Sequence, residues 1–232
     1  MNPNSAKFRA GLIQMRSGRT PQANLDEAIR LIGEAKAAGA DYVLTPEMTN
    51  IMETSREKLL ATIAELDLPH VVVDPVMVAK GGDRLLDEDA VAAMRTELLP
   101  RAHIVTPNVP EAEVLSGLTI RSIDDMRAAG ERILKLGPRV VLVKGGHLDG
   151  PESIDVVCTA QGTFELRGPR IASRHTHGTG CTLSAAIAAN LALGLDDRTA
   201  LTRAREYLEG AIRHAPGIGR GHGPLDHFWR LY

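Results

Sequence analysis

Aromatic residues are scarce in this chain and make up 3% of its 232 residues. Single-stranded nucleic acids are bound by stacking bases on aromatic side chains, so this class of function is disfavoured. Cys158 and Cys181 are the two cysteines, too few for a disulfide framework or a zinc site. No apolar run approaches the ~20 residues of a membrane helix, and the amino-terminal residues do not resemble a secretory signal. A net charge of -2 gives no general attraction to nucleic acids or anionic membranes. We therefore expect a cytoplasmic protein with no nucleic-acid or membrane partner.

The composition favours a folded α/β domain. Hydrophobic residues account for 44% of the chain and charged residues for 24%, which is enough apolar material for a sizeable core. Strand and helix patterns alternate, so we predict one α/β domain over residues 1–232, with three layers and a mainly parallel sheet. The predicted strands are 10–15, 41–45, 70–74, 103–105 and 139–143, followed by a hairpin of 154–159 with 163–167. The predicted helices are 21–38, 55–66, 87–99, 110–115, 122–136 and, as the last long helix, 182–193.

A glycine-rich loop precedes the helix predicted at 182–193. Gly178 and Gly180 bracket Thr179, so the backbone can turn tightly and expose its N–H groups. Such a loop at a helix N-terminus favours an anion, because free amides and the helix dipole both point towards it. Cys181 stands at the helix start, a position that favours the thiolate form. The sequence predicts a phosphate site here, although an ordinary turn before a core helix would give a similar pattern.

Polar residues also follow three of the predicted strands. Asp74 ends one strand, Thr106 with Asn108 and Glu111 follows the next, and Lys144 ends a third. Each has an ordinary explanation, as a turn cap, a first-turn acid or a solvated strand end. Together they supply what a nucleotide phosphate needs, since carboxylates hold Mg²⁺ and a lysine meets phosphate oxygens.

The first fifty residues resemble the nitrilase, or carbon–nitrogen hydrolase, family. The resemblance rests on residues 10–15, Asn24-Leu25, 39–41 and 44–47, and covers about residues 8–50. It implies that Glu47 is the general base of a Glu-Lys-Cys site. Neither cysteine nor any lysine has the surroundings which that site requires, and a lone carboxylate provides no nucleophile. A solvated loop carboxylate is the favoured explanation of Glu47.

From about residue 67 to residue 232 the chain resembles the hydroxymethylpyrimidine/phosphomethylpyrimidine kinase family of thiamine biosynthesis. The matching segments are 72–86, 106–113, 141–147, 176–182 and 221–225, in the family's order. The resemblance implies a ribokinase-like three-layer fold. It also implies ATP and Mg²⁺ as cofactors and a small-molecule pyrimidine as substrate.

The same resemblance assigns roles to individual residues. The anion hole and catalytic group would be Gly178, Thr179, Gly180 and Cys181, with Cys181 taking the proton of the attacking hydroxyl. ATP would be contacted by Lys144, Thr106, Asp74 and His177, and Mg²⁺ would be positioned by Asn108, Glu111 and Asp74, partly through water.

The glycine-rich amino-terminal segment of this kinase family has no counterpart here. We therefore expect a chimera, in which a nitrilase-like piece replaces the kinase's amino-terminal β-α-β portion and leaves the acceptor pocket incomplete. Three functions compete: a pyrimidine kinase acting on a primary hydroxyl or a phosphate, with weak or lost activity; a non-catalytic nucleotide-binding protein; and an amidohydrolase using Glu47. The sequence leaves the oligomeric state open, a homo-oligomer included.

Overall fold

The computed structural model describes residues 9–12, 21–44, 56–77 and 86–231. A two-stranded parallel sheet is formed by β1 (Ala10–Leu12) and β2 (Tyr42–Leu44). A five-stranded sheet has the order β3-β4-β5-β6-β7. Its strands are β3 (Val72–Val73), β4 (Ile104–Val105), β5 (Val140–Val143), β6 (Glu152–Thr159) and β7 (Gly162–Pro169).

Parallel and antiparallel pairing divide the larger sheet. The pairs β3–β4 and β4–β5 are parallel, so the carboxyl ends of these three strands share one edge. The hairpin of β6 and β7 continues the sheet in antiparallel fashion. The prediction of an α/β fold with a mainly parallel sheet and a β-hairpin is confirmed, and the hairpin makes the five-stranded sheet a mixed one.

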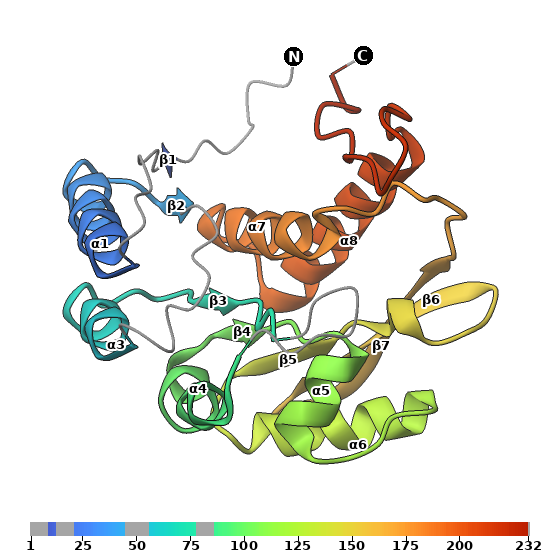
Figure 1. Ribbon diagram of the computed structural model, residues 1–232, viewed down its shortest axis with the longest axis horizontal. Coiled ribbons are helices and arrows are strands. Elements are labelled where there is room, and N and C mark those ends of the chain that lie inside the picture. Colours follow the sequence, from blue (N-terminus) through green and yellow to red (C-terminus); the bar gives the residue numbers. More distant parts are fainter. Residues whose placement is uncertain (1–8, 13–20, 45–55, 78–85, 232) are drawn as a thin grey trace.

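Helices cover both faces of the five-stranded sheet (Figure 1). One face carries α7 (Thr179–Ala192) and α8 (Asp197–Arg213), and the other carries α4 (Glu88–Ala93), α5 (Val109–Ser116) and α6 (Ile123–Leu134). The helix α1 (Pro21–Ala37) lies against β1 and β2, and α3 (Arg56–Glu65) lies beside α1. The short turns η1 (Met94–Leu98) and η2 (Leu99–Arg101) extend α4, and η3 (Gly145–His147) follows β5.

Alternate residues of β5 build two cores. Val141 and Val143 face the layer of α4, α5 and α6, whereas Val140 and Leu142 face α7 and α8. All four side chains are buried, as expected for a strand covered on both faces. The sheet is therefore covered on both faces, and polar residues follow the carboxyl ends of β3, β4 and β5 on one side of it.

Several element predictions need correction. The helix predicted at 182–193 begins three residues earlier, at Thr179, so Gly180 and Cys181 belong to its first turn. It is not the last long helix, because α8 follows it. The helix predicted at 87–99 is a short α-helix extended by a π turn and a 3₁₀ turn. The strand predicted at 70–74 is formed by Val72 and Val73 alone.

Within the described ranges, no helix combines the length and the apolar character needed to cross a bilayer.

Candidate active site

An ion pair between two strand ends lies at the centre of the site. Asp74 follows β3 and Lys144 follows β5, and Lys144 Nζ lies 2.8 Å from Asp74 Oδ1. Their side chains are only 13% and 17% exposed. Thr106, which follows the intervening strand β4, donates its hydroxyl to the same carboxylate oxygen at 3.3 Å. The three parallel strands therefore bring their polar ends together as the sequence predicts.

Asn108 and Glu111 form the amino-terminal cap of α5. Glu111 N–H donates to Asn108 Oδ1 at 2.9 Å, and Asn108 N–H donates to Glu111 Oε2 at 2.8 Å. This reciprocal arrangement is a capping box, which satisfies two backbone donors that a helix start leaves free. The other carboxylate oxygen of Glu111 accepts from Met77 N–H at 3.2 Å. The cap thus joins α5 to the segment after β3.

The carboxyl group of Glu111 is almost completely buried, with 2% of the residue exposed. Burial raises its pKa above the ordinary value, while Lys144 and the N–H of Asn108 oppose this shift. Asn108 also pairs with Lys144 in a parallel bridge beyond the named strands. Glu111 is therefore a buried carboxyl group, bonded to the backbone of Asn108 and Met77 and close enough to Lys144 and Asp74 to interact with their charges.

The start of α7 lies against the ion pair. Gly178 caps the helix in the left-handed conformation, with φ of 81°, which favours glycine. A Cβ on Gly180 would lie 2.7 Å from Asp74 Oδ2 and 3.5 Å from Lys144 Nζ. Only a glycine allows this approach without displacing Asp74. The first turn of α7 and the strand ends therefore share one small volume, as the predicted phosphate site requires.

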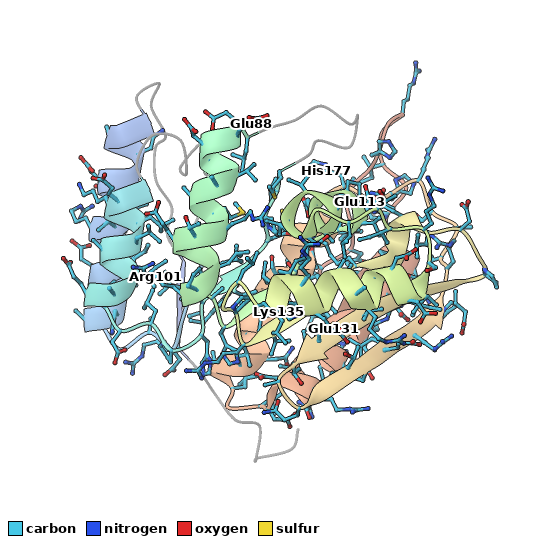
Figure 2. All side chains as sticks on the ribbon, turned by 90° about the horizontal axis from the view of Figure 1, so that it is seen from below. Glu88, Arg101, Glu113, Glu131, Lys135 and His177 are labelled. Atoms are coloured by element: carbon cyan, nitrogen blue, oxygen red, sulfur yellow. The ribbon has the colours of Figure 1, made fainter. Side chains whose placement is uncertain are left out.

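The remaining predicted residues of the glycine loop are less enclosed. Thr179 donates its hydroxyl to the carbonyl of Thr176 at 3.3 Å, which braces the loop. Cys181 and His177 are both exposed, so a ligand can reach them. In Figure 2, His177 lies towards the same side of the molecule as Glu88, the first residue of α4. Arg101 marks the other end of the helical stretch that begins with α4. The assigned roles of Cys181 and His177 in catalysis and cofactor binding stay predictions.

The two cysteines occupy opposite environments. Cys158 lies in β6 under α6 and is completely buried, and burial raises the pKa of its thiol. Cys181 lies in the first turn of a helix and is exposed. A thiolate is favoured at a helix N-terminus and disfavoured in an apolar core, so Cys181 is the candidate reactive thiol.

Sequence reasoning missed the side chains that hold the backbone segment after Lys144 in place. Asp155 on β6 accepts from Gly145 N–H at 2.8 Å, immediately after Lys144. The same carboxylate is paired with Arg205 of α8, and both residues are buried. Arg170 donates to several backbone carbonyls of the segment that follows Lys144. Alternating polar residues in β6 could have indicated Asp155, but its partners come from distant parts of the chain. Glu47 and residues 78–85 lie outside the described residues.

The side chains at this edge suit Mg²⁺ better than a softer metal. Asp74, Asn108 and Glu111 offer oxygen atoms, which are the ligands that Mg²⁺ prefers. Over the described part of the chain, no cluster of three or more histidine, cysteine or acidic side chains could by itself enclose a metal ion. Mg²⁺ is usually held by one or two carboxylates together with substrate phosphates, so the site fits this ion as a partner of a nucleotide.

Comparison with known proteins decides the family. The family model described as phosphomethylpyrimidine kinase matches residues 48–226. The chain belongs to the phosphomethylpyrimidine kinase family. The matched residues include every strand of the five-stranded sheet and all the site residues described above.

Curated relatives of this kinase family agree. The thiamine biosynthesis bifunctional protein ThiED of Geobacter sulfurreducens is 48% identical over 169 residues, covering 73% of this chain and 34% of that protein. The hydroxymethylpyrimidine/phosphomethylpyrimidine kinase of Bacillus subtilis is 42% identical over 173 residues, covering 74% of this chain and 64% of that protein. The matched region thus spans about a third of the Geobacter protein and somewhat under two thirds of the Bacillus protein.

Solved structures place the fold among related kinases. The ADP complex of Bacillus subtilis pyridoxal kinase has a TM-score of 0.77 and 31% identity, covering 89% of this chain and 78% of that one. The phosphomethylpyrimidine kinase of Clostridium difficile has a TM-score of 0.66 and 33% identity, covering 81% of this chain and 76% of that one. The ribokinase-like fold expected from the sequence is supported by these neighbours.

The predicted nitrilase-like segment finds no support in these comparisons. The structural match to pyridoxal kinase covers more of the chain than residues 48–232 alone could supply, so part of the amino-terminal region fits the kinase fold. In the structure β1 and β2 pair in parallel, and β2 lies against α7 together with β3. A strand–helix–strand unit in this position fits the kinase architecture without a second family.

Proposed function

We propose that the protein is an ATP-dependent phosphotransferase that acts on hydroxymethylpyrimidine or its phosphate. The observation that carries the proposal is the meeting of Asp74, Lys144 and Gly180 at the carboxyl ends of parallel strands. Ligands of open α/β sheets bind at such edges. The family membership of the chain and the names of its relatives supply the substrate class.

Each residue of the site has a part in this reaction. The N–H groups of the first turn of α7, from Gly178 to Cys181, face the transferring phosphoryl group. Lys144 exchanges its contact with Asp74 for phosphate oxygens when the nucleotide binds. Asp74 and Asn108 would hold Mg²⁺, and Glu111 would fix Asn108 from behind. The bound ion would neutralise charge on the phosphates.

The proton of the acceptor hydroxyl needs a base in this mechanism. The hydroxyl oxygen forms a bond to the γ-phosphorus while the bond from that phosphorus to the β–γ bridging oxygen breaks and ADP leaves. The hydroxyl proton passes to the Cys181 thiolate. General-base assistance is worth about 10²–10⁴-fold in rate, so this step is important but not the whole of catalysis.

A coupled assay of ADP formation tests the proposal. We expect ADP release from MgATP that depends on hydroxymethylpyrimidine or its phosphate. We expect Cys181→Ala to lower kcat by about 10²–10⁴-fold while the protein still binds MgADP in calorimetry. Buried Cys158→Ser provides the matched thiol control and should retain turnover after its folding has been verified. Loss of nucleotide binding in Cys181→Ala would contradict the assignment of a base.

Pyridoxal is the second candidate acceptor. Neighbouring structures include pyridoxal kinases, one of them a Staphylococcus aureus enzyme in complex with AMP-PCP and pyridoxal. The same assay with pyridoxal in place of the pyrimidine separates the two substrates by their kcat/KM values. Nucleotide binding with no turnover on either acceptor would instead favour a non-catalytic nucleotide-binding protein.

A further inference from the structure

The segment that follows Lys144 is held in place from the inside of the molecule. It comprises residues 145–151 and connects β5 to β6 through the turn η3. Asp155 accepts from Gly145 N–H at 2.8 Å and is itself paired with buried Arg205. A Cβ on Gly145 would lie 1.7 Å from the carbonyl oxygen of Ile154, so the segment begins in backbone contact with β6.

A single arginine holds the same segment from the outside. Arg170 Nε donates to the carbonyl of Gly150 at 2.8 Å, and Nη1 donates to Gly146 at 2.9 Å. Nη2 donates to the carbonyls of Leu148 and, at 3.3 Å, Glu152. A guanidinium has five N–H donors in a fixed fork, and this one gathers three carbonyls of the segment and a fourth from Glu152, the first residue of β6.

Arg170 also lies at a junction in the chain. It directly follows Pro169, the last residue of β7, and begins the stretch that leads to Gly178 and the first turn of α7. Its backbone N–H donates to the carbonyl of Pro151 at 2.9 Å. The residue therefore ties the segment after Lys144 to the stretch that leads to the anion-binding turn.

We propose that Arg170 is a positioning residue for the nucleotide site. It fixes the backbone of residues 145–151 directly after Lys144, so that the Lys144 side chain is held at the strand end facing Asp74 and Gly180, where it can meet a phosphate. This inference rests on the proposed function, because Lys144 is taken to meet phosphate oxygens. Arg170 itself is exposed and needs no contact with the nucleotide.

Arg167 provides a matched control three residues earlier on β7. It too is an exposed arginine, but its guanidinium reaches the carboxylates of Glu152 and Glu165 and not the backbone of the segment. Exposed pairs of this kind contribute little to stability. Replacing Arg167 removes the same charge and the same side-chain volume from the neighbouring surface.

The test compares wild type, Arg170→Ala, Arg170→Lys and Arg167→Ala by calorimetric titration with MgADP and by steady-state kinetics. We expect Arg170→Ala to weaken MgADP binding and raise the KM for ATP by about tenfold, the equivalent of one hydrogen bond between Lys144 and phosphate that a less firmly held Lys144 no longer makes. kcat should fall less than KM rises. Arg170→Lys should be intermediate, because an ammonium cannot span four carbonyls, and Arg167→Ala should match wild type.

Three results would overturn the inference or its basis. Equal MgADP affinity in wild type and Arg170→Ala would refute the positioning role alone. Equal losses in Arg167→Ala and Arg170→Ala would reduce the effect to surface charge and refute it as well. Absence of MgADP binding in wild type would refute the proposed function first and this inference with it. Urea unfolding of all four proteins distinguishes loss of binding from loss of fold.

Discussion

Gly180→Ala tests whether the first turn of α7 and the Asp74–Lys144 pair share one volume. The added Cβ would lie 2.7 Å from Asp74 Oδ2, whereas ordinary contact begins at 3.4 Å, so the two atoms must separate by about 0.7 Å. Lys144 and Thr106 both contact the Asp74 carboxylate, so this group cannot move away without weakening those contacts. A misplacement of about 1 Å can reduce turnover about 10²-fold, so we expect kcat/KM to fall by roughly ten- to a hundredfold.

The free energy of unfolding of Gly180→Ala should fall as well, whereas an uncrowded glycine-to-alanine change in a helix should raise it. Overpacking costs about 1–3 kcal/mol, while replacing glycine by alanine in a helix returns about 0.5–1 kcal/mol, which leaves a net loss of up to roughly 2.5 kcal/mol. At about 2–4 °C per kcal/mol, Tm should fall by up to about 10 °C.

Gly33→Ala provides the matched control for this substitution. A Cβ at this position in α1 meets nothing within 4 Å, so the helix gain of about 0.5–1 kcal/mol should appear alone and raise Tm. Both variants are measured by thermal unfolding and by the coupled ADP assay. If Gly180→Ala behaved like Gly33→Ala in both assays, the close approach of α7 to Asp74 would be refuted.

Two further predictions concern the Asp74–Lys144 ion pair and the contact between His70 and His103. Lys144→Met should abolish MgADP binding in calorimetry and lower the free energy of unfolding by about 1.5–3 kcal/mol, because Asp74 keeps a largely buried charge without its partner; adding Asp74→Asn should restore stability but not binding. Burial, and next the neighbouring His103, lower the pKa of His70 below its ordinary 6.5, while Asp197 opposes this and Arg139 adds to it. The unfolded chain thus binds this proton more tightly, so the free energy of unfolding should decline as the pH falls below about 6.5. His70→Gln should lessen this decline, measured by urea titrations between neutral and acidic pH. If the free energy of unfolding fell with pH as steeply as in wild type, His70 would not be its source.

The convergence of the site could be predicted because it follows from parallel pairing. Short β-branched runs indicate buried strands, and parallel neighbours place their carboxyl ends at one edge. Asp74, Thr106 and Lys144 therefore had to meet once β3, β4 and β5 were assigned as neighbours. The capping of α5 by Asn108 could also be anticipated, since Asn-x-x-Glu is a capping-box pattern.

The details that set distances could not be predicted. The start of α7 depends on the left-handed conformation of Gly178, and the role of Gly180 depends on how closely the helix approaches Asp74. Both are matters of tertiary packing, which a local pattern does not encode. The ion pair of Asp155 with Arg205 joins residues fifty positions apart, and no periodicity links them.

One helix is missing from the sequence predictions, and one predicted resemblance finds no support in the comparisons. The helix α8 was overlooked although its signal was present, with Asp196 as the N-cap and buried Ala200, Leu201 and Ala204 at helical spacing. The resemblance of residues 8–50 to nitrilases is based on short matches at 10–15, Asn24-Leu25, 39–41 and 44–47, which fall in and next to a predicted strand, helix and second strand. Such a unit is common to parallel α/β proteins of many families, so it carries little information about any one of them.

The chemistry of the Asp74–Lys144 pair points to a ligand more strongly than to stability. Removing both charges from water is expensive, and apolar side chains of similar volume commonly hold strand ends together equally well or better. A pair that lies at the shared edge of three strands, with glycine backbone against it, is poorly explained as a means of holding the sheet. It is well explained as a preformed set of opposite charges. In the proposed reaction Lys144 would pair with phosphate oxygens and Asp74 would hold the metal ion, so that each charge would have a partner in the complex.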